Sequence, residues 1–370
     1  MEKNNKNLNV PNLRFPEFSG EWEYHELQSI APKISSGKDK PNNEGTVVLY
    51  GSTGIMGHTT TESYKSEIVI VARVGANAGQ LQLVGIPCGV TDNALVVDAK
   101  SWNKYVFYYL QHFNLNKLVF GSGQPLITGG MLKKIKIWAG NNVERNKIVH
   151  LLSLMEERID TQKKIIEDLK KLKDAITHSH YRNELSHSPM AYIGQYITQV
   201  SKRNKDAKID RVLSVSNKYG FINQDEQFED REVASADTSN YKVVHEGDFA
   251  YNPARINVGS VARLKDFENG IVSPMYVCFT TNKELLPAYF ELYLSTNIFK
   301  HEMTKRLEGS VRLCLTYESL CNIKIALPEI NAQKDFVSKV STILTKIKAE
   351  ERLLLMYHNC KQYLLAQMFI

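Results

Sequence analysis

The chain has 370 residues, a length that suits two or three domains, each large enough to bury a hydrophobic core. Apolar residues make up 43% of it and charged residues 23%, as in ordinary globular proteins, and the net charge of +6 is compatible with a polyanionic partner. The uninterrupted apolar run of about eighteen residues that a membrane span needs is absent, and the Asn- and Lys-rich N-terminus does not resemble a secretory signal, so we expect a cytoplasmic protein.

Short strands separated by glycine-rich turns are expected between residues 45 and 97. The apolar runs are typical of buried strands, and one segment alternates in polarity. The strands are predicted at residues 47–50, 67–73, 80–84 and 94–97, and the turns at 51–57 and 75–79. The first turn lacks the Lys-Ser/Thr of a P-loop, so a nucleotide site is not expected there.

A long amphipathic helix is predicted next, over residues 143–180. Its apolar residues follow alternating steps of three and four, which is the period of a coiled-coil seam. The seam consists of Ile148, Leu152, Met155, Ile159, Ile166 and Leu169, with the polar Gln162 in its middle. The sequence His187-Ser188-Pro189 indicates a boundary after the helix.

The chain then repeats itself. The segment Leu132-Lys-Lys-Ile-Lys-Ile137 returns 188 residues later as Leu320-Cys-Asn-Ile-Lys-Ile325, and Gly121-Ser122 returns as Gly309-Ser310. A second long helix, at residues 331–370, has its seam at the same offset, which two unrelated helices would rarely show. This seam consists of Phe336, Val340, Ile343, Ile347, Leu354 and Tyr357, with Glu350 at the position of Gln162.

The front halves of the two copies resemble each other only weakly. Arg73 with Asn77 and Gly79 resembles Arg255 with Asn257 and Gly259, and the similarity fades upstream of these residues. Strands of the second copy are predicted at residues 211–215, 248–252, 259–264 and 271–279.

Each long helix must bury its apolar stripe, and the other copy is the nearest partner. A helix of roughly 35 residues is about 50 Å long. We expect an antiparallel pair that brings Gln162 close to Glu350 and places Ile159 opposite Leu354 and Ile166 opposite Ile347. A parallel pair, or two helices that each pack on their own domain, are the alternatives.

These patterns predict an α+β fold with two repeated domains of mixed sheet and helices, related by a pseudo-twofold axis, and a pair of long antiparallel coiled-coil helices. We place the first domain at residues 1–142, the first long helix at 143–180, the second domain at 181–330 and the second long helix at 331–370.

No catalytic or metal site is expected. Asn252-Pro-Ala-Arg255 resembles the Asn-Pro-Pro-aromatic loop of adenine methyltransferases, but it lacks the second proline and the aromatic residue, and no glycine-rich AdoMet motif precedes it. No paired carboxylates with a following lysine indicate a nuclease. The five cysteines form no CxxC pair and no cluster with histidine, so we expect reduced thiols and no bound cofactor.

Nucleic-acid binding is the chemistry that the sequence favours. The basic, polar run around Lys202, Arg203 and Lys205 suits phosphate contacts, with a solvated surface stretch as the alternative, and a comparable run lies near Lys33. Gln124 and Arg312 occupy one position in the repeated Gly-Ser loop, and glutamine reads adenine where arginine reads guanine. Alternatively, these two side chains only contact the backbone or cap a turn.

The expected DNA-binding residues form one set in each copy. The first set is Lys33, Ser36, Lys38, Gly51, Ser52, Thr53, Arg73, Asn77, Ser122 and Gln124. The second set is Lys202, Arg203, Lys205, Ser216, Asn217, Lys218, Arg255, Asn257, Ser310 and Arg312.

Several motifs resemble the specificity subunits of type I restriction-modification systems, over nearly the whole chain. They are Leu13-Arg-Phe-Pro-Glu-Phe-Ser-Gly-Glu-Trp22, Tyr50-Gly-Ser-Thr-Gly54, Gly121-Ser-Gly-Gln-Pro125 and Leu327-Pro-Glu-Ile-Asn-Ala-Gln333. The first copy departs from the last motif, with Ala139-Gly140 in place of the proline region and Arg145 in place of the glutamine.

The resemblance implies two target-recognition domains on double-stranded DNA, each of which reads one half of a split, asymmetric site. The helices would be a spacer between half-sites that lie about 34 Å apart. Two methyltransferase subunits would dock on the helices and supply AdoMet, and endonuclease/translocase subunits would complete the complex. The chain itself would be non-catalytic. The alternatives are a coiled-coil scaffold without DNA affinity and a self-contained DNA methyltransferase.

Overall fold

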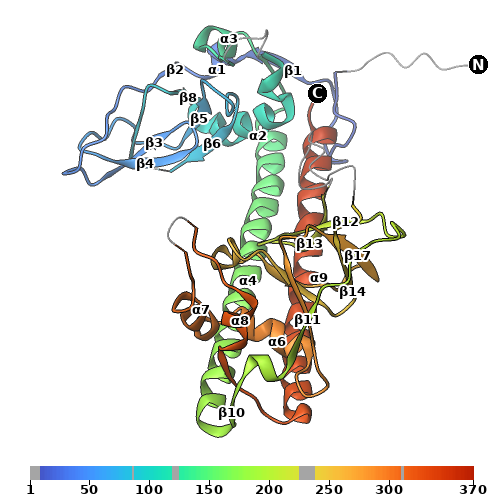
Figure 1. Cartoon of the computed structure of the whole chain (residues 1–370). Coiled ribbons are helices and arrows are strands. Elements are labelled where there is room, and N and C mark those ends of the chain that lie inside the picture. The colour runs from blue at the N-terminus through green and yellow to red at the C-terminus, as the bar shows by residue number, and fades with distance from the viewer. Residues whose placement is uncertain (1–8, 86, 119–124, 225–237, 310–311) are drawn as a thin grey trace, which may run out of the picture. The chain divides into compact units, whose positions relative to one another are not determined.

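A computed structural model describes residues 9–85, 87–118, 125–224, 238–309 and 312–370 (Figure 1). Its internal contacts divide the chain into two compact units. Unit 1 comprises Met1–Lys164 together with Glu351–Ile370, and unit 2 comprises Ile165–Glu350. Because the division falls inside both long helices, each helix belongs to both units.

The first segment of unit 1 runs from a short strand to the first long helix. Its strands are β1 (Glu23–Glu26), β2 (Lys33–Ser36), β3 (Val47–Gly51), β4 (Gly54–Thr59), β5 (Ile68–Ala72), β6 (Leu81–Val84), β7 (Cys88–Val90), β8 (Ala94–Asp98) and β9 (Lys136–Ala139). Its helices are α1 (Leu27–Ile30), η1 (Lys100–Trp102), α2 (Asn103–Phe113), η2 (Leu115–Leu118), α3 (Gly129–Lys133) and α4 (Asn142–His187), of which α4 continues into unit 2.

The sheets of unit 1 are built around β5, which is buried along its whole length. An antiparallel sheet has the order β2-β8-β5-β6, and a smaller sheet has the order β4-β3-β7, in which β3 and β7 are parallel. Val69 and Val71 pack with the aromatic residues of α2, whereas Ile68 and Ile70 belong to a second cluster with Tyr64. The apolar run of β5 therefore serves two cores, because successive side chains of a strand point to opposite faces.

Unit 2 is also built of short strands followed by helices and a long helix. Its strands are β10 (Met190–Tyr192), β11 (Ile197–Val200), β12 (Val212–Ser216), β13 (Gly220–Asn223), β14 (Lys242–His245), β15 (Phe249–Tyr251), β16 (Val261–Arg263), β17 (Asn269–Val272), β18 (Val277–Thr281) and β19 (Lys324–Ala326). Its helices are η3 (Ile193–Gln195), η4 (Ile256–Val258), α6 (Pro287–Leu294), α7 (Asn297–Thr304), α8 (Tyr317–Cys321) and α9 (Ile330–Met368), of which α9 continues into unit 1.

The strand order of unit 2 repeats that of unit 1. The sheet β11-β18-β15-β16 corresponds to β2-β8-β5-β6, and β13-β12-β17-β14 corresponds to β4-β3-β7 with one added edge strand. β12 and β17 are parallel, as β3 and β7 are. In place of β14, unit 1 has an isolated bridge between Tyr64 and Cys88. The internal repeat therefore includes the front halves, in which the two sequences have diverged.

One predicted strand of unit 2 is wrong. The sequence suggested a single strand over residues 271–279, whereas the structure has two strands, β17 and β18, with a turn between them. In this turn the amide of Tyr276 donates to the carbonyl of Ser273 at 3.0 Å. Pro274 follows Ser273 and has no amide hydrogen for a sheet ladder, which explains why the strand ends here.

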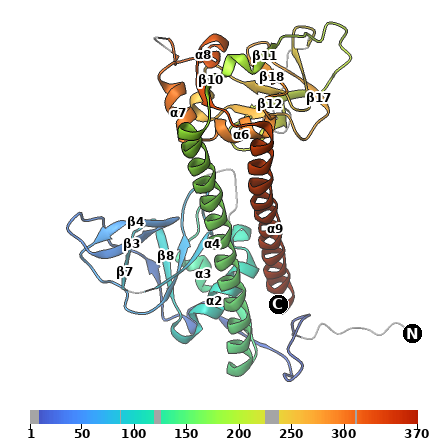
Figure 2. The ribbon, with the colours of Figure 1, turned by 90° about the horizontal axis from the view of Figure 1, so that it is seen from below.

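The long helices α4 and α9 run antiparallel, as expected for two repeats related by a pseudo-twofold axis (Figures 1 and 2). In unit 1 the Nζ atom of Lys361 lies 2.5 Å from Oε1 of Glu156, and Leu365 and Met368 share a core with Leu152. In unit 2 the ring of His180 stacks on Phe336 with 3.6 Å between centroids. The facing pairs predicted near the middle of the helices stay predictions.

The seam positions are buried or half-buried along both helices. The buried residues are Ile148, Leu152, Ile159, Gln162, Ile166, Phe336, Val340 and Ile347, and the half-buried ones are Met155, Leu169, Ile343, Glu350, Leu354 and Tyr357. α4 extends to His187 rather than to residue 180, and it ends two residues before Pro189, which cannot continue a helix.

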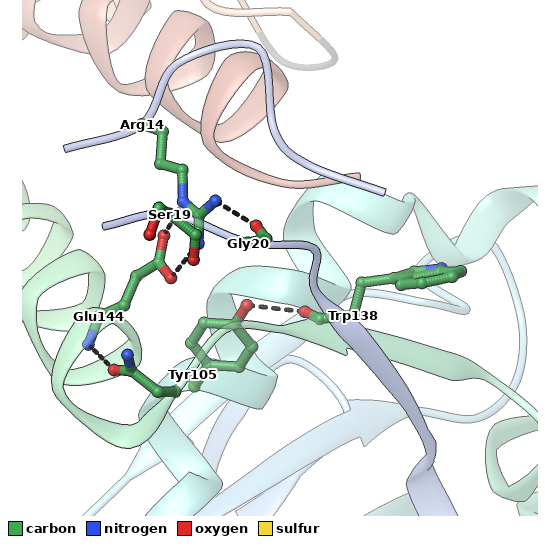
Figure 3. Close-up of polar contacts among 7 residues, drawn as sticks. Arg14, Ser19, Gly20, Tyr105, Trp138 and Glu144 are labelled. Carbon is green, nitrogen blue, oxygen red and sulfur yellow. Dashed lines mark hydrogen bonds and ion pairs between the residues drawn. The ribbon is translucent and has the colours of Figure 1, made fainter. Parts of the chain in front are cut away.

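An ion pair between the half-buried Arg14 and the buried Glu144 holds the N-terminal segment of unit 1 on α4 (Figure 3). Nε and Nη2 of Arg14 donate to the two carboxylate oxygens of Glu144 at 2.7 and 2.8 Å, and Nη1 donates to the carbonyl of Gly20 at 2.5 Å. The side chain of Glu144 is 1% exposed. A Cβ atom on Gly140 would lie 2.0 Å from Oε2 of Glu144, which explains the glycine at this departure from the family motif.

Unit 2 anchors the start of its long helix differently. Gln333 is completely buried, and its amide donates to the carbonyls of Glu284 and Pro328 at 2.8 and 2.9 Å. Its Oε1 accepts from the amide of Leu286 at 2.9 Å. In unit 1 the corresponding Arg145 has its guanidinium carbon 3.6 Å from the ring centroid of Trp102. The glutamine and the arginine therefore occupy equivalent places with different partners.

Candidate nucleic-acid interface

In unit 1, three loops are tied together at the ends of neighbouring strands. The hydroxyl of Ser52, in the β3–β4 turn, donates to the carbonyl of Asn93 at 2.6 Å. The amide of Arg73, at the start of the β5–β6 loop, donates to the same carbonyl at 3.2 Å. The amide of Ile127 in turn donates to the carbonyl of Arg73 at 2.9 Å. The turn, the β5–β6 loop and the residues after the Gly-Ser loop therefore form one edge.

Unit 2 has an equivalent edge. The hydroxyl of Ser260 donates to the carbonyl of Val215, at the β12–β13 turn, at 3.0 Å. The amide of Leu315, after the second Gly-Ser loop, donates to the carbonyl of Pro253 in the β15–β16 loop at 3.1 Å. This bond matches the one between Ile127 and Arg73. We call the two groups of loops the loop edges of unit 1 and unit 2.

The β5–β6 and β15–β16 loops each contain a glycine in the left-handed region. Gly79 and Gly259 have φ values of +91° and +92°, a region that favours glycine, and each follows an exposed asparagine, Asn77 or Asn257, by two residues. The sequence comparison of Arg73 with Arg255 is wrong, however. The amides of Ile127 and Leu315 donate to the carbonyls of Arg73 and Pro253, so Arg73 corresponds to Pro253, and the exposed Arg255 lies two residues further into its loop.

The two strand-connecting turns differ in what they expose. In unit 1, the amide of Gln82 donates to the carbonyls of Gly51 and Ser52, both at 3.0 Å, and Thr53 is exposed. In unit 2, the hydroxyl of Ser216 accepts from the amide of Lys218 at 3.2 Å, and Asn217 and Lys218 are exposed. A hydrogen bond to Tyr219 raises the pKa of the Lys218 ammonium, which therefore stays charged.

The second Gly-Ser loop presents Arg312 to solvent. Glu308 and Cys314 are joined by two backbone hydrogen bonds of 2.9 and 2.8 Å, and Gly309 has a φ of +124°. Arg312 is exposed and makes no ion pair with another residue that the structure describes. Ser310 lies outside the described residues, as do Ser122 and Gln124 in the first copy.

The basic run of unit 2 is held by a buried asparagine. Asn204 is 1% exposed, and its side-chain amide donates to the carbonyl of Ile209 at 2.7 Å. The flanking Lys202, Arg203 and Lys205 are exposed. The sequence missed Asn204, although an asparagine inside a basic loop is a signal for a local turn.

The corresponding basic residues of unit 1 lie at opposite ends of β2. Ser36 pairs with Leu95 at the end of β2 that leads to the loop edge, and Lys38 is exposed just beyond it. Lys33 pairs with Asp98 at the opposite end of β2, where its Nζ atom lies 4.4 Å from the ring centroid of Tyr64. The structure therefore does not bring Lys33 to the loop edge.

Other kinds of site find no support in the part of the chain that the structure describes. Its His, Cys, Asp and Glu side chains form no group of three or more that could hold a metal ion. None of its helices combines the length and the apolar character that a membrane crossing requires.

Sequence comparison finds one family model and one curated relative that are similar to part of this chain. The family model for the type I restriction modification DNA specificity domain matches residues 19–171. The type I restriction enzyme EcoprrI specificity subunit of Escherichia coli is 25% identical over 128 residues. That match covers 34% of this chain and 31% of the relative, so the chain spans about a third of the length of this curated relative.

Solved structures match the chain over nearly its whole length. The S subunit of a type I restriction-modification system from M. genitalium has a TM-score of 0.60 at 16% identity and covers 98% of this chain and 99% of its own. A chain from work on complex assembly and conformational transition of the type I R-M system has a TM-score of 0.54 at 14% identity, over 94% and 97%. These likenesses show the fold.

The chain therefore carries a type I restriction modification DNA specificity domain, and this fold is repeated in unit 2. The specificity subunits of type I restriction-modification systems, which the motifs of this chain resemble, are also the proteins that the family model, the curated relative and the solved structures give as similar to it.

Proposed function

We propose that this chain recognises a two-part DNA sequence, with one half-site read by the loop edge of each unit. The observation that carries this proposal is the repeated edge itself. Equivalent hydrogen bonds, from Ile127 to Arg73 and from Leu315 to Pro253, fix two loop edges on sheets of the same strand order. The exposed side chains at these edges differ, as readers of two different half-sites require.

The chemistry of the exposed residues suits contacts with duplex DNA. Arg255 and Arg312 of unit 2 are suited to the paired acceptors of guanine, and Asn77 of unit 1 is suited to adenine. Lys202, Arg203 and Lys205 would contact phosphates, which supply affinity but no sequence information. Backbone hydrogen bonds hold these loops in place before DNA arrives, which lowers the entropic cost of binding.

The long helices would set the distance between the half-sites. α4 has 46 residues and is therefore about 70 Å long, and both helices belong to both units. In this proposal two methyltransferase subunits dock on the helices and bind AdoMet, and endonuclease/translocase subunits join them. The chain contributes recognition and no catalytic group.

The test is to map adenine methylation across a genome in cells that express the chain with its cognate methyltransferase subunit. We expect a new split motif in which Gln124→Ala alters one half and Arg312→Ala alters the other. A stable complex without new methylation would contradict the proposal and favour a scaffold without DNA affinity. AdoMet binding by the purified chain alone would favour a self-contained methyltransferase instead.

A further inference from the structure

The β3–β4 hairpin of unit 1 exposes two consecutive apolar side chains. Ile55 is 65% exposed and Met56 is 56% exposed. Met56 is the extra residue of a β-bulge, because Leu49 pairs with Gly57 whereas Tyr50 pairs with Ile55. Bulges occur preferentially beside functional sites, where they redirect a side chain.

The matching hairpin of unit 2 shows that the fold does not require this exposure. There Val215 pairs with Phe221, and Ser216 pairs with Gly220, in a regular ladder without a bulge. Phe221 occupies the position of Ile55, yet it is 5% exposed and belongs to a hydrophobic core. The position of Ile55 is therefore exposed in unit 1 and buried in unit 2, where Tyr219 in the hairpin turn is the exposed apolar side chain, at 65%.

Glycines hold the bulged hairpin in shape. Gly54 and Gly57, on either side of the pair, have φ values of +134° and +131°, which other residues rarely adopt. A Cβ atom on Gly51 would lie 2.5 Å from Cγ of Met56, so a larger residue at position 51 would displace the methionine side chain. The backbone is thus arranged to present Met56 in this position.

The apolar pair adjoins the loop edge of unit 1. Ser52, two residues before Gly54, is bonded to Asn93, which also accepts from the amide of Arg73. Thr53 is exposed at the tip of the same turn. The surface that would meet DNA in unit 1 therefore combines uncharged polar groups with two apolar side chains.

We propose that Ile55 and Met56 contact the 5-methyl group of thymine in the major groove, and that they distinguish thymine from cytosine in the half-site that unit 1 reads. The thymine methyl is the apolar group that base pairs present in this groove, and apolar side chains are its usual partners. This inference rests on the proposed function, and it assigns a class of base to one unit.

The test replaces thymine by uracil, which lacks only the methyl group, at each position of the unit 1 half-site in synthetic DNA. The complex with its methyltransferase subunit should methylate the thymine duplex about four-fold faster than the uracil duplex at one position or more, the gain from burying one methyl group. The paired substitution Ile55→Ser and Met56→Ser should abolish this ratio, whereas Ile55→Val with Met56→Leu should keep it.

Three results would overturn the inference while the proposed function stands. They are equal rates on thymine and uracil throughout the unit 1 half-site, a uracil effect confined to the other half-site, and a unit 1 half-site without thymine on either strand. A ratio that survives the paired serine substitution would overturn it as well, because both side chains are exposed and their loss should leave the fold intact. A stable complex that methylates no sequence would contradict the proposed function and this inference together.

Discussion

The loop edges of both units present an exposed asparagine, Asn77 or Asn257. The edge of unit 1 adds Thr53, Ile55 and Met56, whereas that of unit 2 adds Asn217, Lys218, Arg255 and Arg312. Both edges rest on sheets of one strand order and on matching hydrogen bonds. This difference indicates that the exposed side chains of the loops can vary while the buried strands that carry the loops stay the same. Buried strands determine where the loops lie, and the exposed side chains can change because no core residue depends on them.

We expect the largest loss of stability when the side chains that anchor the start of each long helix, Arg14 in unit 1 and Gln333 in unit 2, are replaced. Arg14→Ala leaves the buried Glu144 carboxylate without its cation, which should cost unit 1 about 3–5 kcal/mol. Gln333→Ala should cost unit 2 about 1–3 kcal/mol through unpaired backbone groups. Hydrogen exchange followed by mass spectrometry should show lost protection in α2 for the first variant and in α6 for the second. Lys163→Ala, at an exposed ion pair, is the control, and equal loss in both units would contradict the comparison.

The basic run of unit 2 should dominate the salt dependence of DNA binding. Replacing Lys202, Arg203 and Lys205 by alanine should lower the slope of log K against log salt by about 0.9 for each phosphate contact that is lost. Lys33→Ala should leave the slope unchanged, because Lys33 lies away from the loop edge of unit 1. Fluorescence anisotropy of the complex at several salt concentrations measures both slopes. An equal change for Lys33→Ala would show that its end of β2 also meets DNA.

The two loop glycines test whether the edges are held alike. Gly79→Ala and Gly259→Ala should each cost about 1–2 kcal/mol, because both residues have φ near +90°. The loss should be greater at Gly79, where a Cβ atom would lie 3.0 Å from Oδ1 of Asn116 and 3.2 Å from Leu115. At Gly259 the nearest atom would be the Cβ of Asn217 at 3.5 Å. Urea unfolding of the two variants, monitored for each unit by hydrogen exchange, would reveal the order.

A half-buried histidine in each unit predicts the smallest change in stability. Burial lowers the pKa of His112 in unit 1 and of His180 in unit 2, and Lys117 and Lys339 act in the same direction. Hydrogen bonds to the backbone of Leu365 and Ile370 oppose this shift at His112, as the Glu184 carboxylate does at His180. Because the folded state then binds fewer protons than the unfolded state, stability should fall as the pH drops below about 6.5. The free energy of unfolding, measured at pH 7.5 and 5.5, should fall less in His180→Gln for unit 2 and in His112→Gln for unit 1 than in the unchanged protein. If it falls by the same amount in the variants, other groups cause the acid sensitivity.

Local patterns predicted the parts of the molecule that depend on local sequence. The seam residues repeat at a fixed period, and they are buried or half-buried from Ile148 to Tyr357. β5 was predictable because a continuous apolar run suits a strand with cores on both faces. The strand order shared by the two front halves was not predictable, since pairing between distant strands leaves little trace in diverged sequences.

The site was harder to predict than the fold because its geometry depends on distant partners. Arg73 and Arg255 look equivalent in sequence, and only the hydrogen bonds from Ile127 and Leu315 show the shift of two residues. Met56 gives no signal either, because the bulge that exposes it is defined by pairing with β3. Asn93 belongs to the edge through its backbone carbonyl, a role that any residue type could fill.

Unit 1 is made of two segments that lie far apart in the sequence, and this affects the order in which the units fold during synthesis. Its core needs Leu365, Met368 and Phe369, and the amide of Leu13 donates to the carbonyl of Gln367 at 2.8 Å. All of unit 2, by contrast, lies between residues 165 and 350 and leaves the ribosome earlier than these residues do. Unit 2 can therefore complete its core while unit 1 still waits for its closing segment, although the strands of unit 1 are made first.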